Sequence, residues 1–385
     1  MTMDCKVRVS SLIIFVSLFC SFIPMSFYYI SNGWVVILLI RCVRFALIAY
    51  LAAILMKQRR IRRRFSAMLL FLFFLLATTL INGGTLTTII DNISIILIVM
   101  LVTEHYIFSN EERKYDALKV MHSFFLIMMS VNLVLMIIQP EGVFRVIYEK
   151  DLWHELSYPV HFLNSENRLI EFELPLAVLT IILYEKKILG RFISSFSLLL
   201  VVVTLIKAAS LTSIAGIIVF AATFLLIRKK NVKEKIQLLY PVVFFFQIIF
   251  EAIMTNAYVM AFINFIFGRV DTLFTRHTLA EEAKTVISNN LAIGVGASAS
   301  GRLFAEGSII YWVHNHSLDM LVQSGLIGYV LFIRNLVGKV KNNGANLSME
   351  RKIVFAALIS LFVMGMAESF MYSIEFYLLL ALSDI

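Results

Sequence analysis

Long apolar segments separated by short polar ones run along almost the whole chain. Each apolar run approaches the roughly 20 residues that an α-helix needs to cross a lipid bilayer. We predict about eleven or twelve membrane-spanning helices, since the segments 171–184 and 373–385 are short for a full crossing. The predicted spans lie near residues 11–30, 34–56, 66–82, 86–103, 119–139, 171–184, 192–208, 211–227, 236–255, 317–335, 353–370 and 373–385. The pattern predicts an all-α fold, a polytopic bundle that forms a single integral-membrane domain over residues 1–385.

Composition and charge agree with this class. Hydrophobic residues make up 60% of the chain and charged residues 15%, whereas a soluble protein would carry about 25% charged residues. The net charge of +9 comes largely from basic loops such as 57–64 (KQRRIRRR) and 228–235 (RKKNVKEK). These loops fall at every second connection, which is the positive-inside pattern, so we expect them and both termini on the cytoplasmic side. The positive charge therefore reports topology and gives no reason to expect a nucleic-acid partner.

Cysteine usage indicates neither disulfides nor a metal site. Cys5, Cys20 and Cys42 lie in the first two predicted spans or in the tail before them. The predicted outer loops contain no cysteine, so no disulfide framework is expected there. Histidine and cysteine show no zinc-ligand spacing, and we expect no metal.

Two predicted outer connections are long, at about 140–170 and 256–316, and long loops in compact proteins are usually functional. The second has the texture of an amphipathic helix over 275–289, with an apolar face formed by Leu279, Ala283, Val286 and Ile287. We expect this helix to lie over the outer mouth of the bundle. It is followed by LAIGVGASASG (291–301), where glycines permit tight backbone turns.

The stretch His314–Gly328, HNHSLDMLVQSGLIG, combines a polar start with an apolar run. Read as one helix, it places His314, Leu318, Leu321, Gly325 and Gly328 on a single stripe. The two glycines would let a neighbouring helix approach closely. The prediction is a membrane helix, capped by Asn315 or Ser317, whose outer tip presents His314 and Asn315 to a water-filled site. His316 points away from the stripe and is interpreted as structural.

This region resembles a known family. The order of Arg276, an amphipathic helix, GVG (294–296) and HNxxLxxLxxxGLxG (314–328) is similar to the conserved region of the O-antigen polymerase/O-antigen ligase family, the Wzy and WaaL type. The resemblance covers about residues 269–330, and HFLNSENRL (161–169) resembles the family's asparagine-containing segment. Family members often carry glutamate two residues before the first glycine of the last motif, where this chain has Gln323.

The resemblance implies an integral-membrane glycosyltransferase of the GT-C type in the bacterial cytoplasmic membrane. It would transfer glycan from undecaprenyl pyrophosphate on the outer face, with inversion and without metal or cofactor. We expect a polymerase of surface-polysaccharide repeat units, such as O-antigen, capsule or exopolysaccharide. The implied partners are an undecaprenyl-pyrophosphate-linked oligosaccharide, membrane lipid, a flippase and a chain-length regulator. A ligase to another acceptor is the alternative within the family. A lipid-linked-glycan flippase or transporter is the alternative outside it, for which charges spread through many spans and a pseudo-repeat would be expected.

A departing pyrophosphate needs fixed positive charge, which arginine supplies through bidentate donors. We expect Arg276 to hold it. His314 would either take the proton of the acceptor hydroxyl or hold a phosphate oxygen, and the sequence leaves both roles open. The predicted catalytic residues are His314, Arg276 and Asn315, and the predicted substrate-binding residues are Arg269, Arg168, Arg145, Asn164, Asn167, Gly294 and Gly296.

Other charged residues near or within spans have two interpretations each. For Arg145 a solvated or headgroup contact is favoured over substrate binding. Glu368 and Glu375, near the last predicted outer turn, are candidate partners of the acceptor or of an arginine. Arg41 and Arg44 lie inside the second predicted span, where they would line the path of the lipid donor or pair with Asp91.

Overall fold

A computed structural model describes residues 2–58, 62–83, 86–108, 113–151, 154–165, 168–228, 235–254, 256, 258–259, 261, 270–297, 313–341 and 348–385. The α-helices are α1 (Thr2–Ser21), α2 (Gly33–Gln58), α3 (Arg63–Ile81), α4 (Leu86–Thr103), α5 (Lys114–Ile138), α6 (Ile170–Glu185), α7 (Arg191–Ala208), α8 (Leu211–Arg228), α9 (Lys235–Met254), α11 (Val270–Asn289), α12 (His316–Lys341), α13 (Met349–Met364) and α14 (Ile374–Leu382). The remaining elements are the short helical turns η1 (Met25–Tyr28) and η2 (Glu104–Phe108) and the strands β1 (Phe144–Asp151) and β2 (His154–Val160).

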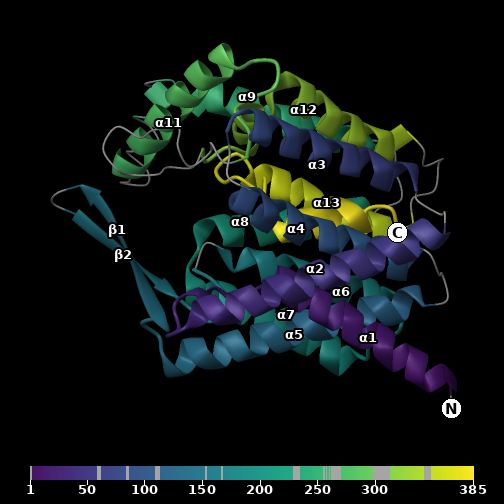
Figure 1. Cartoon of the computed structure of the whole chain (residues 1–385). Helices are drawn as coiled ribbons and strands as arrows, with labels where there is room; N and C mark the ends of the chain where they lie inside the picture. The colour runs from purple at the N-terminus through teal and green to yellow at the C-terminus, as the bar shows by residue number, and fades with distance from the viewer. Residues whose placement is uncertain are drawn as a thin grey trace.

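The helices lie side by side with roughly parallel axes (Figure 1). The β1–β2 hairpin and α11 project at one end of the bundle, which we call the hairpin end, and both chain termini lie toward the other. The all-α class predicted from the sequence is confirmed. Each predicted span overlaps a helix, and the amphipathic segment predicted over 275–289 lies within α11.

The first predicted span, 11–30, is displaced in the structure. Helix α1 ends at Ser21, and the chain then turns through η1 before α2 begins. Pro24 explains the difference, because proline lacks the N–H that a continuing helix requires and disfavours helical geometry in the residue before it.

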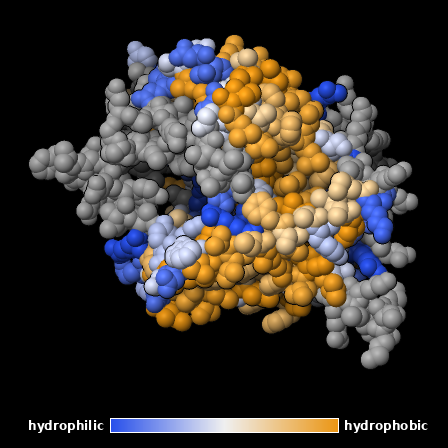
Figure 2. All heavy atoms as spheres, in the orientation of Figure 1, coloured by the Kyte–Doolittle hydropathy of each residue, from blue (hydrophilic) through white to orange (hydrophobic). Residues whose placement is uncertain are grey.

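Several helices have the length and hydropathy of membrane spans. Among the described residues, the helical segments that are apolar and long enough to cross a bilayer are α2, α5, α7, α8, Asp91–Phe108 and His316–Leu336. Figure 2 shows the consequence on the surface: a broad apolar region covers the middle of the visible face, and hydrophilic residues lie toward both helix ends. This distribution fits a bilayer that crosses the helices, as expected of a membrane-spanning protein.

The shorter helices α6, α13 and α14 form the buried centre of the bundle. Helix α13 packs against α6, α8, α9 and α14, and α14 also packs against α4. Almost every residue of α13 and α14 is buried. A helix that is apolar on all sides needs such surroundings. Because these helices are covered by protein along their length, they do not have to present a bilayer-length apolar face to lipid.

The connection at 140–170, predicted only as a loop, contains an antiparallel hairpin. Phe144 pairs with Val160 and Ile147 with Ser157, and a register shift lies near the tip between Glu149 and Asp151. The segments FRVIYEKD and HELSYPV are rich in β-branched and aromatic residues, which is the composition of strands. The composition typical of strands was therefore present in the sequence, although the segment was predicted as a loop.

Helix α12 is not the continuous helix that its stripe predicted. Gly325 has φ 59° and ψ −169°, so the backbone is broken there. In an unbroken helix, Leu326 and Ile327 would donate their N–H groups to the carbonyls four residues earlier. Here they donate instead to the carbonyls of Leu291 and Ala292, at 2.8 Å and 3.1 Å.

The α12 carbonyls that lose their helical hydrogen bonds at this break accept hydrogen bonds from the segment 291–296. Val322 accepts from the Val295 N–H and Gln323 from the Gly296 N–H, both at 2.9 Å. Non-helical backbone at membrane depth is tolerated where protein covers it and pairs its polar groups. The segment 291–296 thus fills the break in α12, a role that the sequence pattern had assigned to a neighbouring helix.

Candidate functional site

Polar side chains gather at the hairpin end of the bundle, where α6, α12 and α14 begin. Asn315 forms the N-cap of α12, because its Oδ1 accepts a hydrogen bond from the Leu318 N–H at 3.1 Å. Its backbone carbonyl accepts from the Asp319 N–H at 2.9 Å. Asparagine is favoured at this position because it satisfies an N–H that has no partner within the helix. The predicted cap is confirmed, and it fixes His314 immediately before the helix.

Gln247 of α9 holds this end of α12 from inside the bundle. Its backbone carbonyl accepts from Asn315 Nδ2 at 3.0 Å, and its Oε1 accepts from Ser317 Oγ at 2.7 Å. Its Nε2 donates to the Phe362 carbonyl of α13 at 2.6 Å. Asn315 is buried with both ends of its side chain engaged. This geometry shows that Asn315 positions the start of α12, and its predicted catalytic role stays a prediction.

His316 joins the start of α12 to the connection between α13 and α14. Its backbone N–H donates to the Gly365 carbonyl at 2.8 Å, and its Nδ1 accepts from the Phe370 N–H at 3.3 Å. The ring is fully buried and makes edge contacts with Phe244 and Phe376. The structural interpretation of His316 is therefore confirmed.

Two further side chains of α12 hold the same connection. The Asp319 carboxylate accepts hydrogen bonds from Ser369 Oγ and from Gln323 Nε2, the latter at 2.7 Å. Gln323 Oε1 in turn accepts from the Tyr372 hydroxyl. The amide at position 323 suits this network, because a glutamate there would face the buried Asp319 carboxylate without a proton to share. The departure from the family pattern at Gln323 thus has a local physical reason.

This scaffold brings His314 against Glu368. Glu368 lies in the connection between α13 and α14, and its Oε2 is 3.4 Å from His314 Nδ1. The two side chains are 37% and 21% exposed. Both are therefore reachable from solvent, although the backbone on either side of them is fixed by buried hydrogen bonds.

Arg168 and Asn164 meet at a second carboxylate, that of Glu171 in the first turn of α6. Arg168 Nη1 donates to Glu171 Oε1 at 3.1 Å, and Asn164 Nδ2 donates to its Oε2 at 3.4 Å. Asn132 of α5 supports this segment by accepting from the Leu163 N–H at 2.9 Å. Sequence analysis named Arg168 and Asn164 but not Glu171. The spacing of three residues between Arg168 and Glu171, which suits a local ion pair, could have identified it.

The two carboxylate pairs share one electrostatic environment. Burial acts to lower the pKa of the Arg168 guanidinium, but the Glu171 and Glu368 carboxylates outweigh it and raise that pKa above its usual value. Glu375, at the start of α14, also interacts with Arg168 and Glu171, and Asp319 interacts with Arg168 and His314. Glu375 thus interacts electrostatically with Arg168, but its two buried carboxylate oxygens have no hydrogen-bond partner among the described residues.

The Arg168 side chain is 48% exposed yet lies deep within the protein. This combination is typical of a residue in the wall of a recess. Figure 2 shows the visible face hollowed toward the hairpin end, with hydrophilic residues inside the hollow. We refer to the group formed by His314, Glu368, Arg168 and Glu171, whose charged side chains lie near one another at the starts of α6 and α12, as the polar recess.

Several predicted site residues are not part of the polar recess as described. Arg145 lies on β1, where it forms an exposed ion pair with Glu141, as its solvated interpretation predicts. Arg276 lies within α11, and its side chain is outside the part of the chain that the structure describes. Arg269 and Asn167 are also outside the described residues.

Gly294 and Gly296 have a packing role in the structure. Both have positive φ, 70° and 84°, which favours glycine. Their N–H groups donate to the carbonyls of Asn290 and Gln323, each at 2.9 Å. A Cβ on Gly296 would lie 2.5 Å from the Thr79 Cα. These donors are engaged and the backbone is closely packed, so both positions need glycine for packing, and their predicted role in substrate binding stays a prediction.

The arginines within α2 follow the pairing alternative. Arg41 Nη2 is 2.6 Å from Asp91 Oδ2 of α4. Arg44 is buried and its Nη1 donates to Ser94 Oγ at 2.9 Å and to the Asp91 carbonyl at 3.4 Å. These contacts are what a charge at membrane depth requires.

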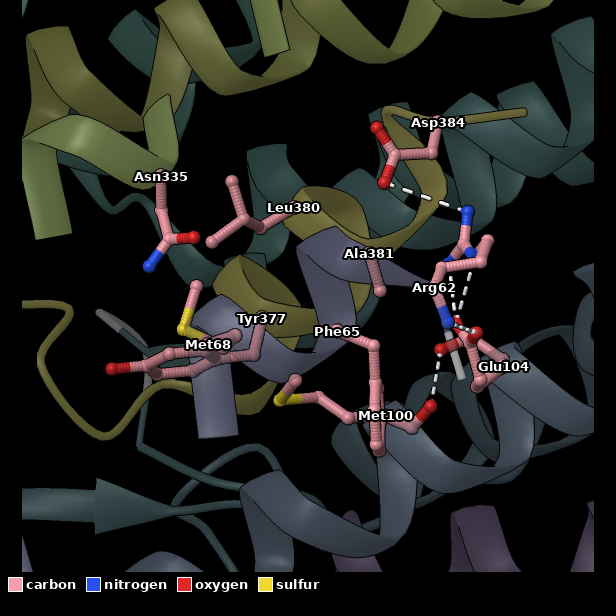
Figure 3. A pocket seen from close by; sticks show the side chains of 11 residues that line it. Arg62, Phe65, Met68, Met100, Glu104, Asn335, Tyr377, Leu380, Ala381 and Asp384 are labelled. Atoms are coloured by element: carbon pink, nitrogen blue, oxygen red, sulfur yellow. Dashed lines mark hydrogen bonds and ion pairs between the residues drawn. The ribbon is translucent and has the colours of Figure 1, made fainter. Parts of the chain in front are cut away.

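A pocket lies beside the C-terminal residues of the chain and is lined by side chains of α3, α4, η2, α12 and α14 (Figure 3). Its space for water-sized molecules, about 30 Å³, suffices for about two waters. On one side, Arg62 contacts Glu104 at 2.5 Å and Asp384 at 3.5 Å. On the other side lie Met68, Asn335 and Tyr377. Because carboxylates already surround the Arg62 charge, this pocket is less suited to an anionic substrate than a site with uncommitted arginines.

Fold and site together define a polytopic helical membrane protein with a mixed-charge recess at one end of the bundle. No protein-family model matches the sequence, and no curated protein matches it either. The resemblance to O-antigen polymerases and ligases therefore rests on the motif residues of this chain.

Proposed function

We propose that the protein polymerises the repeat units of a surface polysaccharide. It would transfer glycan from undecaprenyl pyrophosphate to a second lipid-linked repeat unit, at the outer face of a bacterial cytoplasmic membrane. In this proposal the chain belongs to the O-antigen polymerase/ligase type, has a GT-C-like architecture and crosses the membrane eleven or twelve times. The hairpin end faces outward and the basic loops face the cytoplasm.

The observation that supports this proposal most is the position of His314. It comes from the motif that resembles the family, and it borders a recess shared with Arg168, which comes from the other segment of resemblance about 150 residues earlier. Helix α11, which contains Arg276, packs on α12, which begins just after His314. Groups suited to an acceptor hydroxyl and to an anionic leaving group thus occupy neighbouring elements.

The chemistry that we assign to these groups follows from charge. The acceptor hydroxyl attacks the anomeric carbon of the donor sugar, and the bond from that carbon to the pyrophosphate oxygen breaks. Negative charge develops on the leaving group, so fixed arginine charge stabilises the transition state. We assign that task to Arg276, with Arg269 assisting, because the recess around Arg168 is already rich in carboxylates. Arg168 and Asn164 then act on the acceptor side through Glu171.

Helix α11 is suited to cover such a reaction. Its residues Ala280 and Ala283 are buried against Val313, Leu318 and Val322 in a small apolar cluster separate from the main core. Its opposite face carries the exposed ion pair of Lys284 with Glu281. An amphipathic helix of this kind can exclude water from the transfer point while remaining at the membrane surface.

The test is a reconstituted reaction. Purified full-length protein is mixed with a synthetic undecaprenyl-pyrophosphate repeat unit, and the products are separated by size. Wild type should give a ladder, and Arg276→Ala and His314→Ala should give none while remaining folded. Lys284→Ala is the matched control, because it removes an exposed positive charge from the same helix without touching the recess; it should give the wild-type ladder.

Other outcomes separate the alternatives. Glycan transfer that appears only when a different acceptor is supplied would identify a ligase. Binding of the lipid substrate with no glycan product from either acceptor would contradict both enzyme assignments and favour a flippase or transporter. Loss of the ladder in Lys284→Ala to the same extent as in Arg276→Ala would show that the assay reports general damage to α11 and would remove the support for Arg276.

A further inference from the structure

The contact between His314 and Glu368 distinguishes the two roles that the sequence leaves open for His314. A neutral imidazole has one donor nitrogen and one acceptor nitrogen. Glu368 can only accept when ionised, so the contact between its Oε2 and His314 Nδ1, at 3.4 Å, requires the proton on Nδ1. The other nitrogen, Nε2, is then a hydrogen-bond acceptor. A general base needs such an acceptor nitrogen, whereas a residue that binds phosphate must donate a hydrogen bond to it.

The surrounding charges point the same way. The carboxyl groups near His314 come from several elements: Asp319 on α12, Glu368 between α13 and α14, and Glu171 and Glu375 at the starts of α6 and α14. Arg168 is the cation that the described residues place among them. Among the described side chains, a pyrophosphate at this place would meet more carboxyl groups than cations, whereas a sugar hydroxyl would find acceptors on several sides.

Glu368 is held firmly enough to orient a ring. The connection that contains it is fixed to α12 on both sides: Gly365 accepts from the His316 N–H, and Phe370 donates to His316 Nδ1. Ser369, the next residue, donates to the buried Asp319 carboxylate. His314 is fixed in turn by the Asn315 cap. The relative position of the two side chains therefore depends on backbone contacts that no substrate has to form.

We propose that Glu368 is a positioning residue that holds His314 in the Nδ1–H form, so that Nε2 accepts the proton of the acceptor hydroxyl. In the transfer step the acceptor O–H bond breaks and its proton moves to Nε2, while the oxygen forms the new bond to the anomeric carbon. The pyrophosphate leaves with the electron pair of its bond to that carbon. The resulting imidazolium lies beside the Glu368 carboxylate, which stabilises it, and later releases the proton to water. The identity of the acceptor in this inference rests on the proposed function, whereas the contact between Glu368 and His314 is independent of it.

The test combines kinetics with a direct measurement of the tautomer, both on the full-length protein. Glu368→Ala and Glu368→Gln should lower kcat by about 10²–10⁴-fold, the usual contribution of an oriented base, and should change KM little. Glu368→Asp, which keeps a carboxylate on a shorter side chain, should recover part of the loss. Asp116→Asn is the matched control, since it removes an acidic group from an exposed pair with Lys119 on α5; it should behave as wild type.

The tautomer is read from nitrogen-15 resonances of histidine-labelled protein, with His314→Ala used to assign the His314 signals among the seven histidines. Wild type should show a protonated Nδ1, and Glu368→Ala should shift His314 toward the Nε2–H form. This readout does not depend on turnover. A merely structural role for Glu368 would lower melting temperature and activity together but would leave the tautomer unchanged.

The outcomes separate failure of this inference from failure of the proposed function. If wild type polymerises and Glu368→Ala keeps kcat within about threefold, the positioning role is refuted while the function stands. An Nε2–H tautomer in wild type refutes it whether or not the protein is active. If wild type gives no glycan product but shows the Nδ1–H form, lost in Glu368→Ala, the polymerase assignment fails and the Glu368–His314 pair remains as the polar centre of a different activity.

Discussion

The insertion of the 291–296 segment into the break of α12 makes a sharp prediction for Gly294→Ala. Gly294 has φ 70°, and a Cβ there would lie 2.5 Å from the Gly325 nitrogen and 2.6 Å from the Gln323 carbonyl carbon and oxygen. These are backbone atoms, so no side chain can rotate away to make room. The positive φ costs about 1–2 kcal/mol for a residue with a Cβ, and overpacking adds about 1–3 kcal/mol. We expect a loss of roughly 2–5 kcal/mol in the free energy of unfolding.

Gly83→Ala separates the two contributions. Gly83 also has φ 70°, but a Cβ there would meet nothing within 4 Å. This variant should therefore lose only the backbone contribution of about 1–2 kcal/mol. The assay is thermal unfolding of the detergent-purified protein, followed by tryptophan fluorescence at one fixed scan rate, because membrane proteins often unfold irreversibly. The melting temperature should fall in the order wild type, Gly83→Ala, Gly294→Ala.

Gly325→Ala provides a test of the contact itself. Gly325 has φ 59°, and its Cβ would lie 2.5 Å from the Gly294 nitrogen. Because the two glycines approach each other, either substitution alone should displace the loop from the break. The double variant should then be less destabilised than the sum of the single ones. Equal melting temperatures for Gly294→Ala and Gly83→Ala, or strict additivity of Gly294→Ala with Gly325→Ala, would refute the insertion of the loop.

Two further predictions concern the ends of the bundle. Arg62→Ala should lower stability by about 3 kcal/mol or more, because Glu104, which is 2% exposed, loses the hydrogen bonds from that guanidinium. Adding Glu104→Gln should recover part of the melting temperature, and no recovery would contradict a charge effect. Asn315→Ala should cost about 1–2 kcal/mol through loss of the N-cap to Leu318. Asn315→Ser, which retains a capping oxygen, should recover most of that loss in the same melting assay; failure to recover would mean that the bond to the Gln247 carbonyl dominates.

The helical architecture follows from the sequence because lipid imposes a length and a polarity on each span. The segment 86–103, for example, is predicted and observed with the same bounds. The error at 11–30 has a local cause, since Pro24 interrupts an apolar run that hydropathy alone reads as continuous. The hairpin at 144–160 was missed for a different reason. Hydropathy detects spans but is insensitive to the alternation and β-branched composition that identify a strand outside the membrane.

The break at Gly325 lies beyond what the sequence pattern can reveal. Glycine within an apolar helical pattern is compatible with close helix packing and with a positive φ, and spacing does not choose between them. The choice is made by residues 291–296, which offer two donors and two acceptors in the register that the broken helix needs. A long-range exchange of hydrogen bonds leaves no local signature, because each partner alone resembles an ordinary turn or an ordinary helix.

The sequence indicated which polar side chains belong to the candidate site, but not which of them contact each other. His314, Arg168 and Asn164 stand out because polar residues at the ends of apolar spans are few, and helix capping by Asn315 follows from local rules. Glu368 was predicted as a partner of an arginine or of the acceptor, and the structure adds a contact with His314, 54 residues away, that the sequence did not indicate. The contact between Glu368 and His314 depends on the hydrogen bonds that His316 and Asp319 of α12 accept from the connection after α13. Among the described residues, the same contacts place carboxyl groups around Arg168, which is why the proposed function assigns the pyrophosphate to α11 and the acceptor to the polar recess.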